Sequence, residues 1–189
     1  MRPFASNRLA TVAGSVSAAA LLAACGSMSP MGAGFSQASL PASIQVPAGH
    51  RVAMETVGTG EILYECRDKA NMPGQMEWTF VGPEARLMDR AGKQVGRYYG
   101  PPATWESMDG SKLTATQLAV APSSPTSLPY QLVKANPAMG SGAMSGVTYI
   151  QRVALTGGVA PAAMPCTAMT KGQKTTVPYK ADYIFWKAA

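Results

Sequence analysis

The stretch VTYIQRV (147–153) is the clearest strand signal in this chain, because β-branched and aromatic residues are frequent in it. Gly157 and Gly158 follow it and mark where the strand ends. A two-residue alternation of side chains between opposite faces is expected in EILYEC (61–66) and over residues 175–186. In the last segment one face carries Tyr179, Ala181, Tyr183 and Phe185. These segments indicate a β-sheet protein.

Turn residues separate the alternating segments at close intervals. Asp109 and Gly110 lie between residues 103–108 and 112–120, a pattern typical of a tight β-hairpin. Residues 90–93 read RAGK and predict a second hairpin loop. Roughly eight to ten short strands joined by such turns predict an all-β fold, either an antiparallel β-sandwich or a barrel-like sheet.

One segment departs from this pattern. Residues 121–145 are rich in Pro, Ser, Gly and Met, and we expect a long exposed excursion there. Within it, residues 128–134 are compatible with a short helix or with a strand, because a short apolar run has no decisive periodicity.

The first 25 residues, MRPFASNRLATVAGSVSAAALLAAC, are typical of an export signal. Two arginines precede an apolar stretch of small residues that is too short for a stable membrane span. The last four residues, LAAC, resemble a lipobox, in which the thiol of Cys25 receives a diacylglyceryl group. Gly26 at the next position, rather than Asp, favours the outer membrane, with the domain facing the periplasm or the cell surface. The alternative is an ordinary secretory signal with an incidental cysteine.

Cleavage at this site would leave 165 of the 189 residues and lower the formal net charge from +6 to +4. So small an excess, without a basic run and in an exported chain, argues against a nucleic acid partner. We expect a signal peptide at 1–24, a flexible tether at 25–43 and a β-domain at 44–189. Phe35 and Leu40 are apolar residues of the tether that could pack on the domain.

Cys66 and Cys166 remain after lipidation and lie 100 positions apart. In an oxidising compartment an even pair predicts a disulfide, and closing so long a loop stabilises the fold by at most about 4.7 kcal/mol. The alternatives are two free thiols, or a copper site that adds Met164 and Met169. Because the single histidine excludes a multi-histidine site within one chain, we expect no metal and no cofactor.

Five separated strings resemble, in order, the bacterial, fungal and plant family known as domain of unknown function 3455. They are GEILYEC (60–66), WTFVGPEARLMDRAGKQVG (78–96), ATWESMDGSKL (103–113), GVTYIQRVALTGG (146–158) and PYKADYIFW (178–186). The resemblance covers residues 44–187 and implies a secreted domain with no assigned activity. The family carries a His shortly before its Gly-Pro-Thr-Trp-Glu-like string. Tyr98 or Tyr99 stands there in this chain, so a catalytic role for that His does not carry over.

Trp105, Glu106 and Asp109 form the most prominent cluster of functional side chains. In a glycoside hydrolase a tryptophan would stack on the sugar, and two carboxyl groups would act as the acid and base. The structural alternative places Trp105 in the core and makes Asp109 a turn residue, chosen for its local hydrogen bonding. A buried Trp105 and a turn-capping Asp109 would therefore count against the hydrolase.

Arg152 and Trp105 are the two candidate binding residues. Arg152 neighbours Gln151 in the strand signal, so one of these two side chains faces inward. A buried arginine requires a negative partner, and Glu65, Glu77 or Asp182 could supply the carboxylate. This favours a structural ion pair over an anion-binding site.

No nucleophile–base pair, metal set or phosphate-binding loop can be assembled from the sequence. We therefore expect a lipid-anchored binding or envelope-associated structural module, with enzyme activity disfavoured. Its expected partners are the membrane, through the lipid, and a glycan or envelope protein. The alternative is a glycan-acting or cell-wall-acting hydrolase that uses Glu106 and Asp109.

Overall fold

A computed structural model describes residues 34–189, and strands dominate this part of the chain. No α-helix occurs among these residues. In chain order the elements are η1 (Ala42–Ile44), β1 (His50–Asp68), β2 (Met76–Met88), β3 (Gln94–Tyr99), β4 (Thr104–Ser107), β5 (Lys112–Ala121), β6 (Tyr130–Ala135), β7 (Val147–Gly157), η2 (Ala168–Thr170) and β8 (Lys174–Ala188). The strand predicted at 147–153 is β7, and the strand predicted at 175–186 is β8.

The eight strands form one antiparallel sheet that closes on itself. Each strand pairs with the next along the chain, and β8 pairs with both β7 and β1, so we call the closed sheet the ring. The hairpins predicted around residues 90–93 and Asp109-Gly110 join β2 to β3 and β4 to β5. The all-β antiparallel prediction is confirmed, in its barrel-like form rather than as two separate sheets.

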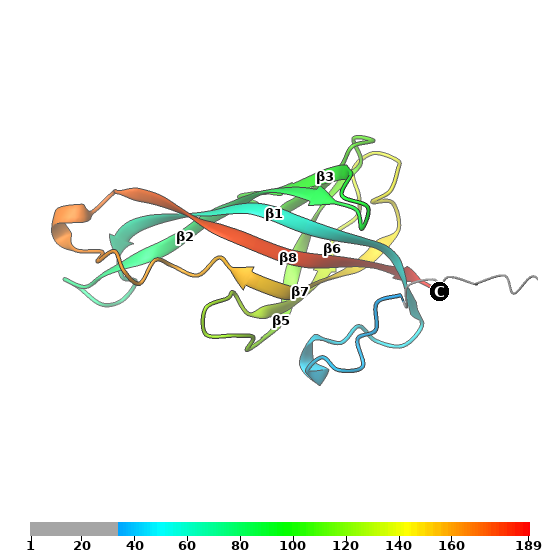
Figure 1. The fold of residues 1–189 in the computed structure, drawn as a ribbon, viewed down its shortest axis with the longest axis horizontal. Coiled ribbons are helices and arrows are strands. Elements are labelled where there is room, and N and C mark those ends of the chain that lie inside the picture. Colours follow the sequence, from blue (N-terminus) through cyan, green and yellow to red (C-terminus); the bar gives the residue numbers. More distant parts are fainter. Residues whose placement is uncertain (1–33) are drawn as a thin grey trace, which may run out of the picture. The chain divides into compact units, whose positions relative to one another are not determined.

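Strands β1, β2 and β8 extend past the other strands at one end of the ring (left in Figure 1). The loop between β7 and β8 lies at this end and carries η2. Cys66 of β1 is bonded there to Cys166 of the loop, with 5.5 Å between the Cα atoms. The predicted disulfide is therefore confirmed, and it ties the long β7–β8 connection to the ring.

Side chains alternate between the inside and the outside of the ring, as the two-residue pattern predicts. The interior is filled mainly by aromatic and branched residues, with Tyr98 stacked on Trp105 at 4.6 Å between ring centroids. Tyr183 is fully buried and contacts both rings. The face predicted for β8 is confirmed, because Tyr179, Ala181, Tyr183 and Phe185 all lie in this core.

A second apolar cluster lies on the outside of the ring, under the segment that precedes β1. Ile44 and Val46 of that segment pack against Ile184 and Trp186 of β8. Gln151 of β7 faces this side and is buried, accepting a hydrogen bond from the Trp186 indole N–H at 2.9 Å and donating to the Ile44 carbonyl at 2.6 Å. Fixed polar contacts therefore hold the segment on the sheet.

The flexible tether predicted at 25–43 does not extend through residues 34–43. Phe35 lies edge-on to Trp186 at 6.2 Å, and its backbone N–H donates to Glu55. Leu40 packs on the same outer cluster. Burial of these apolar side chains fixes the segment against the sheet, so the described body begins near residue 34 rather than at residue 44.

The excursion predicted at 121–145 contains a strand of the ring, β6, so it is two loops rather than one. The undecided segment 128–134 is largely β6, because its backbone pairs with β5 on one edge and with β7 on the other. In the second loop Met144 is only 1% exposed and lies in the interior core. Tertiary pairing therefore overrides the loop-like composition.

Replacing both Cys66 and Cys166 with serine should lower the free energy of unfolding by about 2–4 kcal/mol, because the 100-residue loop is then unrestrained in the unfolded chain. Urea unfolding of the oxidised protein and of the double variant measures this difference. Equal midpoints and equal slopes would contradict a stabilising role for the bridge.

Candidate functional site

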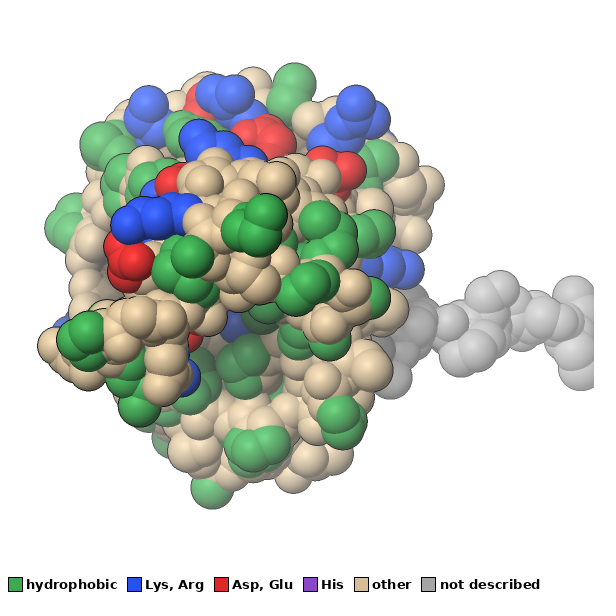
Figure 2. All heavy atoms as spheres, turned by 90° about the vertical axis from the view of Figure 1, so that its left-hand side faces the viewer, with side chains coloured by type: hydrophobic (Ala, Val, Ile, Leu, Met, Phe, Trp, Pro, Cys, Tyr) green, Lys and Arg blue, Asp and Glu red, His purple; other side chains and the backbone are tan. Residues whose placement is uncertain are grey.

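A cavity of about 220 Å³ opens at the end of the ring where β1, β2 and β8 extend, and we call it the mouth cavity. Strands β2 to β7 and the loop between β3 and β4 all contribute to its wall. Figure 2 faces this end of the ring and shows a hollow with hydrophobic and basic side chains recessed in it. Its lining residues include Phe80, Pro83, Tyr98, Pro101, Trp105, Ala115, Gln117, Gln131, Val133 and Arg152.

Among the described residues that line the mouth cavity, Arg152 supplies the only charged side chain. Its Nη2 group donates to the Pro129 carbonyl at 3.0 Å, whereas its buried Nε–H has no partner. Within residues 34–189 no carboxylate lies within ion-pair distance of this guanidinium. The predicted structural ion pair of Arg152 is therefore wrong.

The three carboxylates proposed as partners of Arg152 lie elsewhere. Asp182 accepts from Arg90 at 2.7 Å, and Glu65 accepts from Arg67 at 2.9 Å. Glu77 is exposed on β2. Asp182 precedes the inward-facing Tyr183, so its own side chain points out of the ring, away from the interior that Arg152 faces.

Trp105 lies beside Arg152 in the wall and is 2% exposed. Its indole N–H is buried and has no hydrogen-bond partner, which is uncommon for a buried tryptophan. The two residues with unpartnered buried donors, one on β4 and one on β7, therefore line the same cavity. A buried Trp105 cannot stack on a sugar at the surface, so that predicted role is wrong.

Buried tyrosines lie beside this cavity: Tyr98 lines it, and Tyr183 contacts the rings of Tyr98 and Trp105. Burial raises the pKa of the hydroxyl groups of Tyr98, Tyr179 and Tyr183, and the positive charge of Arg152 opposes that rise in each case. The hydroxyl groups of Tyr179 and Tyr183 are hydrogen-bonded to each other. The tyrosines are thus neutral at physiological pH and do not neutralise the arginine.

Other residues that line the cavity are more exposed than Trp105. Phe80 is 48% exposed and lies edge-on to Tyr64 at 6.0 Å. On the other side the Gln131 amide donates to the Gln117 carbonyl oxygen at 2.6 Å. An aromatic ring and two amides therefore line the same cavity as the arginine.

Glu106 and Asp109, the carboxylates of the predicted hydrolase pair, are both engaged in structural contacts. Glu106 accepts from the Tyr99 hydroxyl at 2.7 Å and from Arg97 at 3.0 Å, and these donors hold its pKa below the usual range. Asp109 accepts from the backbone N–H and the hydroxyl of Ser111 and from the Ala143 N–H. These bonds lower its pKa from 3.8 to about 2.

A glycoside hydrolase needs one carboxyl group whose pKa is raised, so that it can donate a proton. Both groups here have lowered pKa values, and Asp109 caps the hairpin turn and secures the β6–β7 loop. The arrangement therefore supplies no general acid, and it assigns Asp109 a structural role.

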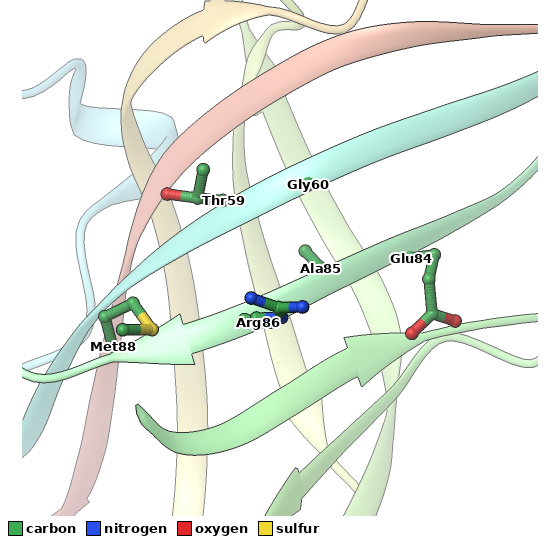
Figure 3. A pocket seen from close by; sticks show the side chains of 6 residues that line it. All are labelled: Thr59, Gly60, Glu84, Ala85, Arg86 and Met88. Atoms are coloured by element: carbon green, nitrogen blue, oxygen red, sulfur yellow. The ribbon is translucent and has the colours of Figure 1, made fainter. Parts of the chain in front are cut away.

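A larger hollow of about 600 Å³ lies over the β1–β2 pair. Figure 3 shows Thr59 and Gly60 on β1, and Glu84, Ala85, Arg86 and Met88 on β2. The two backbones approach closely here, since a Cβ atom at Gly60 would lie 2.0 Å from the Glu84 carbonyl oxygen. Only two neighbouring strands border this hollow, and no buried unpartnered polar atom faces it, so the mouth cavity is the better candidate site.

A scan against protein-family models matches residues 47–187 to a family described as a protein of unknown function, DUF3455. The chain belongs to the DUF3455 family. Neither the curated proteins nor the solved structures contain a match to this DUF3455 chain. Tyr98 and Tyr99 stand where the family resemblance places a His. Tyr98 lines the mouth cavity, whereas the Tyr99 hydroxyl donates a hydrogen bond to Glu106 on the outside of the ring.

Sequence reasoning selected Trp105 and Arg152 in the DUF3455 domain but missed that they share one cavity. It also missed Phe80, Gln117 and Gln131, which line the same wall. Alternation along β5 and β6 places both glutamines on the interior face, and that signal was available. These residues come together because the ring closes, and no local sequence pattern reveals that closure.

Other features of the sequence lie apart from this site. Lipidation at Cys25 and the signal at 1–24 fall outside the described residues. Within the described part of the chain, no helix is long and apolar enough to cross a bilayer, and no three His, Cys, Asp or Glu side chains are grouped as a metal site would need.

Replacing Asp109 with asparagine should lower the melting temperature at pH 7, because the carboxylate that secures the β6–β7 loop loses its charge-assisted hydrogen bonds. The pKa of Asp109 is lower in the folded state, so its contribution is complete above about pH 4 and is lost as the pH falls towards 2.

The measurement is the difference in melting temperature between wild type and variant at several pH values. It should be constant above about pH 4 and shrink below it. The exposed Asp68→Asn variant, which affects only a surface pair with Lys171, is the control and should change stability little. A difference that does not vary with pH would contradict this role of Asp109.

Proposed function

We propose that this DUF3455 protein is a lipid-anchored binding module of the bacterial envelope, which holds a small ligand in its mouth cavity. The observation that carries the proposal is the convergence of aromatic and polar side chains from six strands on one cavity, while the remaining interior is filled by core residues. Concave sites of this composition, at the open end of a closed sheet, are the usual binding sites for small molecules.

The size of the cavity indicates what kind of ligand would fit. A volume of about 220 Å³ is below the range of about 300–1,000 Å³ that is typical of sites for drug-sized molecules. A ligand of one ring or a short chain therefore suits the mouth cavity better than an oligosaccharide or a peptide.

The envelope location rests on the sequence. An apolar leader ends in LAAC at Cys25, which is the pattern of a lipidated export signal. The Cys66–Cys166 disulfide is consistent with this compartment, because such bonds persist in oxidising environments. Between Cys25 and the packed segment that starts near residue 34, a few Ser-, Gly- and Met-rich residues would connect the lipid to the domain.

A binding role also agrees with the contacts of the side chains that could act as acids or bases. Glu106 and Asp109 serve as hydrogen-bond acceptors in fixed structural contacts. The tyrosines near the cavity are held neutral by burial, and no titratable base accompanies them in its lining. The mouth cavity can therefore position a ligand, but it has no acid–base pair with which to transform one.

The test is a thermal-shift screen of the mature chain carrying Cys25→Ser, against single-ring aromatic and short-chain compounds, both neutral and anionic. Some of these compounds should raise the melting temperature, since a ligand that binds only the folded state stabilises it. The matched variant Ala103→Trp should abolish the shifts, because a bulky ring at this lining position fills the cavity. The absence of any shift, or equal shifts in both proteins, would contradict the proposal.

A further inference from the structure

We propose that the mouth cavity selects a small organic oxyanion, whose carboxylate or phosphate pairs with the Arg152 guanidinium while its flat apolar part lies against the aromatic wall. This inference rests on the proposed binding function and specifies its ligand class. It reassigns Arg152 from a structural ion pair to the residue that determines specificity.

The first argument is the missing counter-charge. A guanidinium is a permanent cation, and placing it in a partly enclosed site without a negative partner costs free energy. Arg152 faces the interior of the ring and has one hydrogen bond, to the Pro129 carbonyl, while its Nε–H is buried and unpartnered. An oxyanion in the cavity would supply the missing negative charge beside this guanidinium.

The second argument is the composition of the surrounding wall. Within residues 34–189 the lining of the mouth cavity contains no Asp, Glu or Lys, so Arg152 sets its net charge. Asp182 and Glu65, two of the carboxylates that could have neutralised Arg152, are already paired with other arginines. The charge is therefore available to a ligand and is not neutralised by the protein.

The third argument concerns the rest of the ligand. Phe80, Pro83 and Pro101 offer flat apolar surfaces, and Tyr98 and Trp105 lie deeper in the same wall. The buried Trp105 ring closes this wall from below, stacked on Tyr98. A planar or short apolar body with one oxyanion thus matches the cavity, whereas a free inorganic ion would leave the aromatic wall uncovered.

The experiment compares matched pairs of compounds on the mature chain carrying Cys25→Ser, by isothermal titration calorimetry. Benzoate and phenyl phosphate are the anionic probes, and benzamide and benzyl alcohol are their neutral counterparts. Inorganic phosphate and acetate test whether the charge alone is enough. We expect at least one of the two aromatic anions to bind at least about tenfold more tightly than its neutral counterpart and than the small ions.

Three variants test the assignment to Arg152. Arg152→Gln should abolish the preference for anions, and Arg152→Lys should retain part of it, because a lysine keeps the charge but loses the fork geometry. Arg86→Gln, which removes an exposed arginine of the hollow over β1 and β2, is the matched control and should bind as wild type does.

The melting temperature of Arg152→Gln without ligand distinguishes a binding role of Arg152 from a structural one. Removal of an unpaired, partly enclosed cation should leave the melting temperature unchanged or raise it, whereas loss of a structural ion pair would lower it. A clear loss of stability would overturn the proposal.

The outcomes also distinguish the proposal of anion selection by Arg152 from the broader proposal that the mouth cavity binds a ligand. If benzamide binds as tightly as benzoate, and Ala103→Trp blocks both, the site is a binding site for neutral ligands and the anion proposal fails alone. Wild-type affinity for the aromatic anions in Arg152→Gln has the same consequence. If no compound of either kind binds, the proposed binding function fails as well.

Discussion

The hydrogen bonding of β8 along both of its edges is the constraint on which the rest of the structure depends. Because this last strand pairs with β7 and with β1, the first and last strands of the fold meet and the sheet has no free edge at this junction. Closure also explains the alternation along β8. Its odd-numbered side chains, such as Tyr183, fill the interior, while Ile184 and Trp186 form the outer surface that the segment before β1 covers.

Closure creates two different ends. At one end the β6–β7 loop inserts Met144 into the core, and the Asp109 carboxylate secures that loop through the Ala143 N–H. At the other end β1, β2 and β8 run on to the disulfide, and the strands between them leave the mouth cavity. The charge of Arg152 lies at this open end, so the fold combines a packed interior with one polar site.

The features that the sequence predicted are local ones. The residue types of 147–153 identified β7, alternation identified β8 and its inward face, turn residues identified the hairpins, and the two cysteines identified the disulfide. The features it missed depend on distant partners. Residues 130–135 become a strand because both neighbours pair with them, and residues 34–43 are held by β7 and β8. Alternation alone could have excluded Asp182 as a partner of Arg152, since an inward Tyr183 implies an outward Asp182. That Arg152 lines a cavity could not be predicted, because the cavity forms only when the ring closes.

The most direct test of the central claim is an NMR spectrum of the arginine side chains, recorded on ¹⁵N-labelled protein during titration with benzoate. The Arg152 Nε–H signal, identified by its absence in Arg152→Lys, should shift strongly on saturation, because an oxyanion pairs with the guanidinium that carries it. The Arg86 signal should stay in place. An Arg152 signal that does not move while benzoate binds elsewhere would contradict the account.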